Sequence, residues 1–175
     1  MSTLEGKTYW VIGASEGLGR EIAKGLVDAG AHVVLSARSG KRLQQLAWAL
    51  GSATPLAMDV TDATSVQDAV KNLGPIDGVV YNAGTYAPMR SQEWDSRTAL
   101  GMLEVNFSGA VRVLGHILPE FVAKESGDIT LIGSLAGYQG LPAAVGYGAS
   151  KSALISLAET MRHDLRGSGV TVRIV

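Results

Sequence analysis

Residues 8–19 of the chain read TYWVIGASEGLG, in which a short apolar run ends in a glycine-rich turn. The run predicts a strand at 8–12, and apolar residues then recur at helical spacing as far as Gly30. Glycine permits backbone angles that other residues avoid and leaves the main chain open to a pyrophosphate, which the N–H groups and dipole of the following helix attract. The stretch therefore predicts a phosphate-binding turn that comprises Gly13, Ser15, Gly17, Leu18 and Gly19. A tight turn that needs glycine only for its geometry is the alternative.

The same alternation of strand and helix continues along the chain. Short apolar strands are expected at 32–36, 54–58, 76–81, 128–132 and 170–175, and helices at about 43–50, 65–73, 98–123 and 147–166. Strands of about five residues that alternate with helices of ten or more imply right-handed crossovers and a parallel sheet covered on both faces. The predicted fold is a doubly wound α/β sheet, the Rossmann fold, with ligand bound at the carboxyl ends of the strands.

Composition narrows the possible functions. The chain has 175 residues, 46% of them hydrophobic, which suits a single domain over residues 1–175. Its 15 basic and 16 acidic residues nearly cancel and form no run, so small molecules and other protein subunits are expected partners, whereas nucleic acid and membranes are not. With no cysteine, and with histidines only at 32, 116 and 163, no metal site is expected. The absence of a secretory signal and of a run of about 18 apolar residues predicts a cytoplasmic location.

The end of the second expected strand bears on the choice of dinucleotide. Residues 36–42 read SARSGKR and contain no carboxylate that could accept a hydrogen bond from the ribose 2′-hydroxyl of NAD. Arg38 instead offers a planar donor fork suited to a 2′-phosphate, so NADP(H) is favoured over NAD(H). Two alternatives stay open: Arg38 could be part of a solvated basic turn, and Glu16 in the glycine turn could lie close enough to oppose the phosphate.

Residues 147–151 read YGASK, which resembles the Tyr-x-x-x-Lys signature of the short-chain dehydrogenases/reductases. The other marks of that family follow in order along essentially all 175 residues: the glycine turn at 13–19, Asp59-Val60, Asn82-Ala83-Gly84, Asn106 and Ser134. The resemblance implies an NADP-dependent oxidoreductase that interconverts a carbonyl and an alcohol, with Asn106, Ser134, Tyr147 and Lys151 as its catalytic residues. It also implies cofactor contacts from Asp59, Val60, Asn82, Ala83, Gly84, Tyr147 and Lys151, and a homodimer or homotetramer.

The chemistry of these side chains favours the same assignment. Tyr147 and Lys151 are four residues apart on an expected helix and so project from one face. A neighbouring ammonium favours the phenolate, so Tyr147 is expected to give its proton to a carbonyl oxygen while Lys151 tunes it and holds the ribose. Ser134 would donate a hydrogen bond to the same oxygen. By resemblance, Asn106 would interrupt its helix and hold a water that links Lys151 to solvent.

Each of these residues also has a purely structural interpretation. Tyr147 and Lys151 could be a packing residue and a solvated charge, and Ser134 a turn residue or helix cap. Asn106 could be a capped irregularity, and Asp59 part of a capping cluster with Thr61 and Asp62.

The sequence departs from the family pattern at two places. Ile12 stands where the family commonly has a threonine that ties the glycine turn to the Asn-Ala-Gly segment, so that hydrogen bond is in question. Family members also continue beyond the position of Val175 with a substrate-covering lid and a seventh strand. We therefore expect residues 1–175 to be part of a longer chain.

The sequence is also compatible with two other functions, and it predicts an assembly of subunits. A 3-oxoacyl-carrier reductase shares all of these motifs, and a non-catalytic dinucleotide-binding protein, such as a sensor or structural subunit, needs only the glycine turn. The helices expected at 98–123 and 147–166 carry apolar residues beyond one stripe, which predicts a subunit interface or, alternatively, denser packing within the chain. These residues are Leu100, Met102, Leu103, Val111, Val113, Leu154, Ile155 and Leu157.

Overall fold

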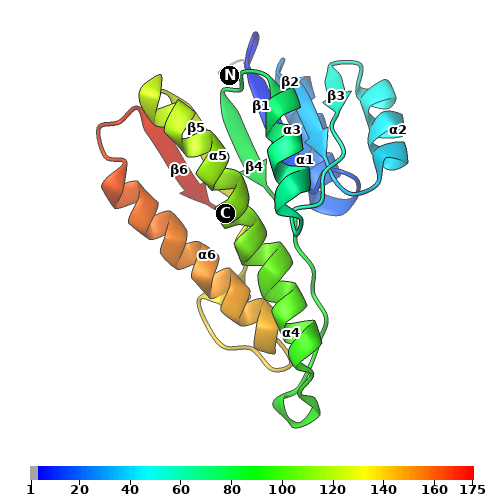
Figure 1. Cartoon of the computed structure of the whole chain (residues 1–175), viewed down its shortest axis with the longest axis vertical. Helices are drawn as coiled ribbons and strands as arrows, with labels where there is room; N and C mark the ends of the chain where they lie inside the picture. The colour runs from blue at the N-terminus through cyan, green and yellow to red at the C-terminus, as the bar shows by residue number, and fades with distance from the viewer. Residues whose placement is uncertain (1–3) are drawn as a thin grey trace.

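Six parallel strands form one twisted sheet in the order β3-β2-β1-β4-β5-β6 in this computed structural model, which describes residues 4–175 (Figure 1). The strands are β1 Thr8–Ile12, β2 His32–Ser36, β3 Ala53–Pro55, β4 Gly78–Tyr81, β5 Gly127–Leu131 and β6 Val170–Ile174. The strand order reverses between β1 and β4, and loops at such a reversal splay apart to leave a crevice at the carboxyl ends. The predicted doubly wound sheet is confirmed.

Helices connect successive strands as the sequence predicts. They are α1 Gly17–Asp28, α2 Gly40–Leu50, α3 Ala63–Leu73, α4 Ser96–Leu103, α5 Gly109–Ala123 and α6 Val145–Asp164. The helix expected at 98–123 is present, but a π-helical turn at Glu104–Ser108, labelled η2, separates α4 from α5. Two short 3-10 turns that the sequence did not predict lie at Ser91–Glu93 (η1) and Leu135–Gly137 (η3).

Alternation along the strands divides the apolar side chains between two cores. Trp10, Ile12 and Ile129 point into a core with α3, α5 and α6, which cross the front of the sheet in Figure 1. Val11 and Leu35 point the other way, into a smaller core with α1 and α2. Each large side chain that is fully buried in this way stabilises the fold by about 1.5–3 kcal/mol relative to exposure.

Cover on both faces, as predicted from the sequence, holds only for part of the sheet. On β6 the side chains that point away from α6, Thr171 and Arg173, are exposed, and Arg173 forms an ion pair of 2.7 Å with Asp128 of β5. Asp128 also accepts a hydrogen bond from the Tyr9 hydroxyl at 3.0 Å. Within residues 4–175 the α1–α2 core does not extend over β6, and polar side chains occupy that face instead.

The third strand is shorter than the expected 54–58. Regular pairing stops at Pro55, which has no N–H to donate, yet the chain still follows β2. Leu56 N–H donates to the Leu35 carbonyl (2.8 Å) and Met58 N–H to the Ala37 carbonyl (3.1 Å). The expected segment therefore lies beside β2 along its whole length, although only its first half is a regular strand.

Most of the apolar residues that suggested a subunit interface fill the protein's own core. Met102, Val113 and Leu154 are fully buried and Ile155 nearly so, as denser packing within the chain predicts. Leu100 on α4 and Val111 on α5 remain exposed, at 63% and 44% of their surface.

None of the helices described is long and apolar enough to cross a membrane. Among residues 4–175, no group of three or more histidine, aspartate or glutamate side chains is arranged to hold a metal ion.

Candidate active site

The glycine turn adopts the conformation that its sequence predicts. Gly13 has a φ of +85°, and a Cβ at this position would lie 2.7 Å from the Ala83 nitrogen. A Cβ on Gly19 would collide with the Gly13 carbonyl oxygen, so α1 could not pack this close to the turn. Glu16 precedes α1 and its side chain caps none of the first-turn N–H groups, which leaves them open to an anion.

Asn82 ties the glycine turn to the next loop of the site. Its side-chain Nδ2 donates to the Gly13 carbonyl at 3.0 Å, and its backbone N–H donates to the Ile12 carbonyl at 2.9 Å. The connection that Ile12 put in question is therefore made by Asn82 itself.

A cavity of about 880 Å³ opens at the carboxyl ends of β1, β2 and β4. Eight of the predicted cofactor residues line it: Gly13, Ser15, Arg38, Asp59, Val60, Asn82, Ala83 and Gly84. Five others do not: Gly17 and Leu18 are exposed at the start of α1, Gly19 is buried under the turn, and Tyr147 and Lys151 belong to α6. The cavity could hold an extended dinucleotide between the glycine turn and Gly84.

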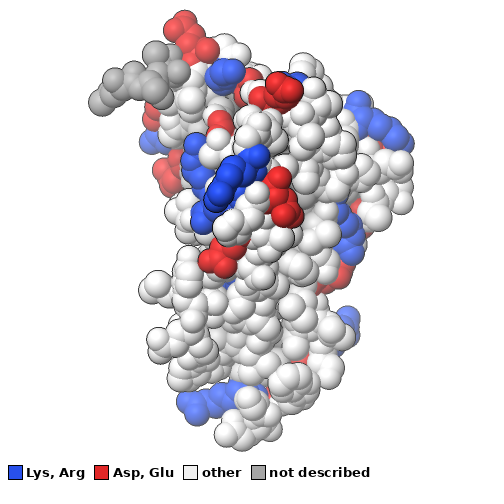
Figure 2. Space-filling view, turned by 90° about the vertical axis from the view of Figure 1, so that its left-hand side faces the viewer, with Lys and Arg blue, Asp and Glu red and all other residues white. Residues whose placement is uncertain are grey.

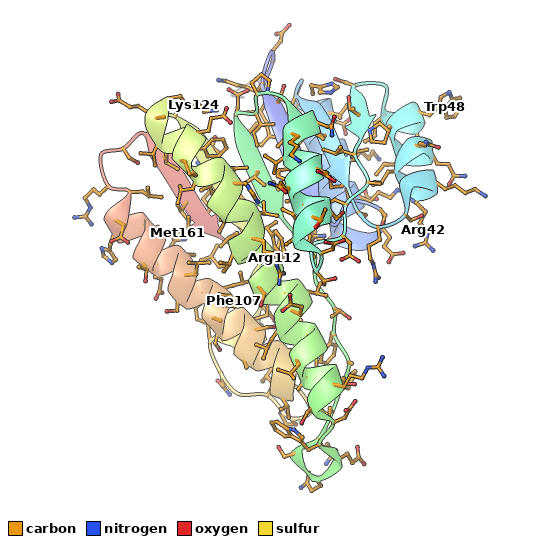
Figure 3. All side chains as sticks on the ribbon, viewed as in Figure 1. Arg42, Trp48, Phe107, Arg112, Lys124 and Met161 are labelled. Atoms are coloured by element: carbon orange, nitrogen blue, oxygen red, sulfur yellow. The ribbon has the colours of Figure 1, made fainter. Side chains whose placement is uncertain are left out.

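Charged side chains gather at the end of this cavity next to β2. Arg38 and Arg42 both line it, and Arg42 forms an exposed ion pair of 2.7 Å with Glu16. Figure 3 shows Arg42 at the end of α2 that lies toward the carboxyl edge of the sheet. Glu16 lines the cavity as well, so it does lie near the place expected for a 2′-phosphate, where Arg42 is paired with it. Sequence reasoning missed Arg42, although Ser39 as the N-cap of α2 places it in the first helical turn.

Asp59 lies at the cavity and bonds to the segment before α3 without capping that helix itself. It lines the cavity and also accepts from the backbone N–H (2.9 Å) and hydroxyl (2.8 Å) of Thr61. The backbone hydrogen bond is the main reason that the pKa of Asp59 lies below its usual value, with Arg38 adding a smaller electrostatic contribution. The side chain that caps α3 is Asp62, which accepts from Thr64 N–H at 2.8 Å.

Asn106 lies in the π-helical turn, so the predicted interruption of its helix is confirmed. In this turn Gly109 N–H bonds to the Glu104 carbonyl, which leaves the Val105 carbonyl without its usual α-helical donor. The Tyr81 hydroxyl supplies a replacement at 2.6 Å. Burial raises the pKa of Tyr81 well above its ordinary value, so the phenol stays neutral and keeps its proton to donate.

Arg112 connects the same turn to the cofactor cavity. Its guanidinium donates to the Val60 carbonyl at 3.0 Å and also bonds to Glu104. Figure 3 shows Arg112 in the middle of the molecule, where the ribbon of α5 runs next to α3. The backbone of Val60, a predicted cofactor contact, is thereby held by α5, the helix that follows the π-helical turn.

The Asn106 carboxamide joins the π-helical turn to the loop after β4 and to α6. Its Oδ1 accepts from Thr85 N–H at 2.7 Å, and its Nδ2 donates to the Thr85 carbonyl at 3.0 Å and to Ser150 Oγ at 2.9 Å. Ser150 in turn donates to the Tyr147 carbonyl at 2.7 Å. Asn106 is fully buried, so these bonds fix the loop after β4 against the first turns of α6.

Lys151 is buried beside Tyr147, unlike a solvated surface lysine. Only 3% of its surface is exposed, and its Nζ donates to the Ile132 carbonyl at 2.6 Å and lies 5.7 Å from the centre of the Tyr147 ring. Burial lowers the pKa of Lys151 to about 8. A Cβ on Gly84 would lie 3.8 Å from the same Nζ, so Lys151 comes close to the cavity at Gly84.

Ser134 follows β5 and caps the short turn η3. Its Oγ accepts from Ala136 N–H at 3.2 Å, so the cap interpretation of its local role is right. Within the described residues no acceptor takes its hydroxyl proton, which remains free to donate to a ligand. The turn packs directly on α6, because a Cβ on Gly137 would lie 2.8 Å from the Lys151 carbonyl carbon.

Tyr147 is half-buried and contacts a second tyrosine that sequence reasoning missed. The ring centres of Tyr147 and Tyr86 are 4.8 Å apart, with the planes tilted by 52°. Tyr86 follows Gly84 by two residues in an irregular loop, and no periodicity or motif in the sequence indicates the contact.

Comparison with known proteins agrees with this geometry. A family model described as short chain dehydrogenase matches residues 7–175, and the chain belongs to this family. An uncharacterized oxidoreductase of Myxococcus xanthus is 34% identical over 183 residues, which cover all of this chain and 72% of the relative.

Two further relatives carry functional names. The 3-oxoacyl-(acyl-carrier-protein) reductase of Salmonella typhimurium is 31% identical, over 99% of this chain and 73% of its own. The structure of a gluconate 5-dehydrogenase from Burkholderia cenocepacia in complex with NADP and tartrate superposes with a TM-score of 0.93 at 25% identity, over 98% of this chain and 71% of that one. Oxidoreductase chemistry on alcohols or carbonyls with a nicotinamide dinucleotide is the shared activity.

Proposed function

We propose that the protein interconverts a ketone and an alcohol with NADP(H), and that Tyr147 is its general acid and base. The observation that carries the proposal is the buried Lys151 beside the half-buried Tyr147, next to Gly84 at the edge of the cavity. A lysine with a pKa of about 8 stays largely protonated at neutral pH, so a positive charge lies beside the proposed proton donor. If Tyr147 and Lys151 had only a structural role, the lysine charge would not need to be buried.

Each residue of the site has a distinct part in the proposed reaction. When bound, the cofactor supplies the hydride for reduction or accepts it for oxidation. During reduction Tyr147 gives its phenolic proton to the carbonyl oxygen, and during oxidation it takes that proton back. Ser134 donates its free hydroxyl proton to the same oxygen and stabilises the developing negative charge. Lys151 stabilises the tyrosinate that forms after proton transfer, and Asn106 fixes the loop and helix that hold both residues.

The glycine turn and Arg38 support the choice of cofactor. The open N–H groups of α1 suit the pyrophosphate, and Asp59, Val60, Asn82, Ala83 and Gly84 line the remainder of the cavity. Arg38 is placed to bind a 2′-phosphate at the end of the cavity next to β2. Arg42 adds a second positive charge there and is paired with Glu16. This arrangement favours NADP(H) over NAD(H).

A carrier-bound 3-oxoacyl chain is a second candidate substrate because the Salmonella relative is named for that activity. The experiment that tests the proposal mixes the protein with NADPH and a panel of ketones and 3-oxoacyl thioesters while NADPH absorbance is followed. We expect consumption of NADPH that depends on the carbonyl compound. NADPH binding without consumption for any compound would favour a non-catalytic dinucleotide-binding protein.

We also propose that two or more copies assemble through α4 and α5, because Leu100 and Val111 on these helices stay exposed. Light scattering at micromolar concentration tests this assembly, and a strictly monomeric mass would contradict it.

A further inference from the structure

Tyr86 occupies a fixed position although it lies in an irregular loop. The residue before it, Thr85, is held at both its N–H and its carbonyl by the buried Asn106 carboxamide. The residue after it, Ala87, donates its N–H to the Met102 sulfur at 3.4 Å. The backbone on either side of Tyr86 is therefore anchored to α4 and the π-helical turn.

The Tyr86 side chain is placed against the reacting group and still faces solvent. Its ring centre is 4.8 Å from that of Tyr147, yet 52% of its surface is exposed. The Tyr86 ring does not fill the core, yet it contacts Tyr147, the proposed acid. A substrate that approaches Tyr147 would therefore also contact Tyr86. Tyr86 thus differs from Tyr81, which is buried and donates its hydroxyl proton to the chain itself.

Large exposed side chains with apolar surface stand beside the proposed reaction centre, although Arg90, Gln92 and Gln139 also line a cavity next to Tyr138. Leu135, directly after Ser134, is 82% exposed, and Tyr138 at the end of the same turn is 68% exposed. On the face drawn in Figure 2, charged side chains gather over the upper half, and the part beyond the carboxyl ends of the strands is mostly uncharged. Exposed apolar groups of this kind favour a ligand with apolar surface.

We propose that the natural substrate is a ketone, or the matching alcohol, that carries an aryl or similarly flat apolar group, and that this group packs against Tyr86. The inference rests on the proposed function, because it takes Tyr147 as the residue that contacts the carbonyl oxygen. A carbonyl that accepts a hydrogen bond from Tyr147 brings its substituent alongside the neighbouring ring, where tilted or offset aromatic packing is favourable. Tyr86 is then a residue that determines specificity.

Steady-state kinetics of wild type, Tyr86→Ala and Tyr86→Phe with acetophenone and 2-butanone test the proposal. We expect wild type to prefer acetophenone in kcat/KM, and Tyr86→Ala to lower the ratio of the two kcat/KM values about tenfold, as loss of one aromatic contact predicts. Tyr86→Phe should keep the wild-type ratio, because the ring and not the hydroxyl makes the contact. A ratio in Tyr86→Ala within twofold of wild type, an equal drop in Tyr86→Phe, or faster turnover of a keto sugar acid than of acetophenone would overturn the proposal.

Binding of acetophenone to the NADP⁺-saturated protein, measured by calorimetry, separates this inference from the proposed function. Binding weakened by Tyr86→Ala but without turnover by wild type would contradict the proposed reaction and support the aryl site. Turnover of other ketones without any binding of acetophenone would overturn the aryl site and leave the reaction standing. If the protein neither binds acetophenone nor turns over any ketone, both the aryl site and the proposed reaction are overturned.

Discussion

The two ends of the proposed cofactor and substrate site are built in different ways. The nucleotide end, around β1, β2 and α2, relies on backbone geometry at Gly13 and on the exposed side chains of Arg38, Arg42 and Glu16. The catalytic end, around β4, β5 and α6, relies on side chains that are almost fully buried. Asn106, Ser150 and Lys151 have 3% or less of their surface exposed, and the Tyr81 hydroxyl beneath them is buried too.

This difference predicts different responses to mutation. Exposed charges contribute little individually and are screened by salt, so changes at the nucleotide end should shift cofactor preference and leave the fold intact. Buried polar groups are costly to leave unpaired, and none of the described buried side-chain nitrogens or oxygens lacks a partner. Substitutions at the catalytic end should therefore change both kcat and the free energy of unfolding. A side chain that contacts only the ligand is the exception, because its substitution should change kcat alone.

The largest expected effect is on turnover. Tyr147→Phe removes the proton donor and should lower kcat roughly 10²–10⁴-fold, the usual contribution of general acid–base catalysis, while the Kd for NADPH stays within about twofold. Steady-state kinetics and fluorescence titration with NADPH measure the two quantities. Tyr9→Phe, at the opposite ends of the strands, is the matched control and should keep kcat. Retained turnover in Tyr147→Phe would contradict the assignment of the acid.

The next effect is on stability at the catalytic end. Asn106→Ala leaves the buried Ser150 hydroxyl without its donor and the partly buried Thr85 N–H and carbonyl without their side-chain partner, which should lower the free energy of unfolding by about 3 kcal/mol. Asn72→Ala, which removes an exposed bond to the Asp68 carbonyl, should change it by no more than about 0.5 kcal/mol. Urea unfolding measures the free energy of unfolding of both variants. An equal loss in the two would contradict the claim that buried hydrogen bonds set the catalytic end apart from exposed parts of the molecule.

A third test uses the buried charge of Lys151, and here the variant should be more stable. The pKa of Lys151 falls from 10.5 to about 8 on folding, so below pH 8 the charged form is destabilised in the folded state. Lys151→Met removes that penalty but also the bond to Ile132, and should raise the free energy of unfolding at pH 7 by about 2 kcal/mol.

The pH dependence of the gain in stability of Lys151→Met shows whether burial of the charged lysine is its cause. Between pH 8 and 10.5 the unfolded chain binds more protons at Lys151 than the folded protein, so wild-type stability rises with pH in that window. The advantage of Lys151→Met should shrink accordingly between unfolding measurements at pH 7 and pH 10. Lys71→Met, at an exposed lysine on α3, should show no such trend. A constant difference for Lys151→Met would contradict the burial argument.

The smallest expected effect is at the nucleotide end. Wild type should bind NADPH about thirtyfold more tightly than NADH, equivalent to roughly 2 kcal/mol, and Arg38→Ala should narrow that gap. Arg42→Ala should narrow it less, because Arg42 also pairs with Glu16, and added salt should weaken the preference in each protein. Titration with both cofactors measures the ratios, and a ratio that Arg38→Ala leaves at its wild-type value would make Arg38 a solvated turn residue.

The strands and the motifs at their ends could be predicted from the sequence because both follow local rules. Apolar runs of five residues and glycines at 13, 17 and 19 are visible in any short window, and a parallel sheet brings strand ends together at one edge. The position of Asn82 at that edge follows from the topology, whereas Asn106 and Lys151 lie in helical segments and were predicted from the resemblance to the family.

Contacts between irregular segments could not be predicted in this way. Tyr86 meets Tyr147 across a loop of no regular geometry, and Tyr81 finds a carbonyl that only the π-helical turn sets free. Arg42 lies in a helix that the sequence did indicate, but its pairing with Glu16 depends on how α2 is placed against the glycine turn.

The central claim is that a carbonyl compound receives hydride in this site. Its most direct test supplies NADPH with deuterium at the transferable position of the nicotinamide, together with acetophenone or another ketone that the protein consumes. Mass spectrometry of the alcohol then shows whether deuterium sits on the carbon that bears the hydroxyl. We predict one deuterium per alcohol formed by wild type and almost no labelled alcohol from Tyr147→Phe in the same time. Alcohol formed without deuterium, or labelled alcohol formed at the wild-type rate by Tyr147→Phe, would contradict the account.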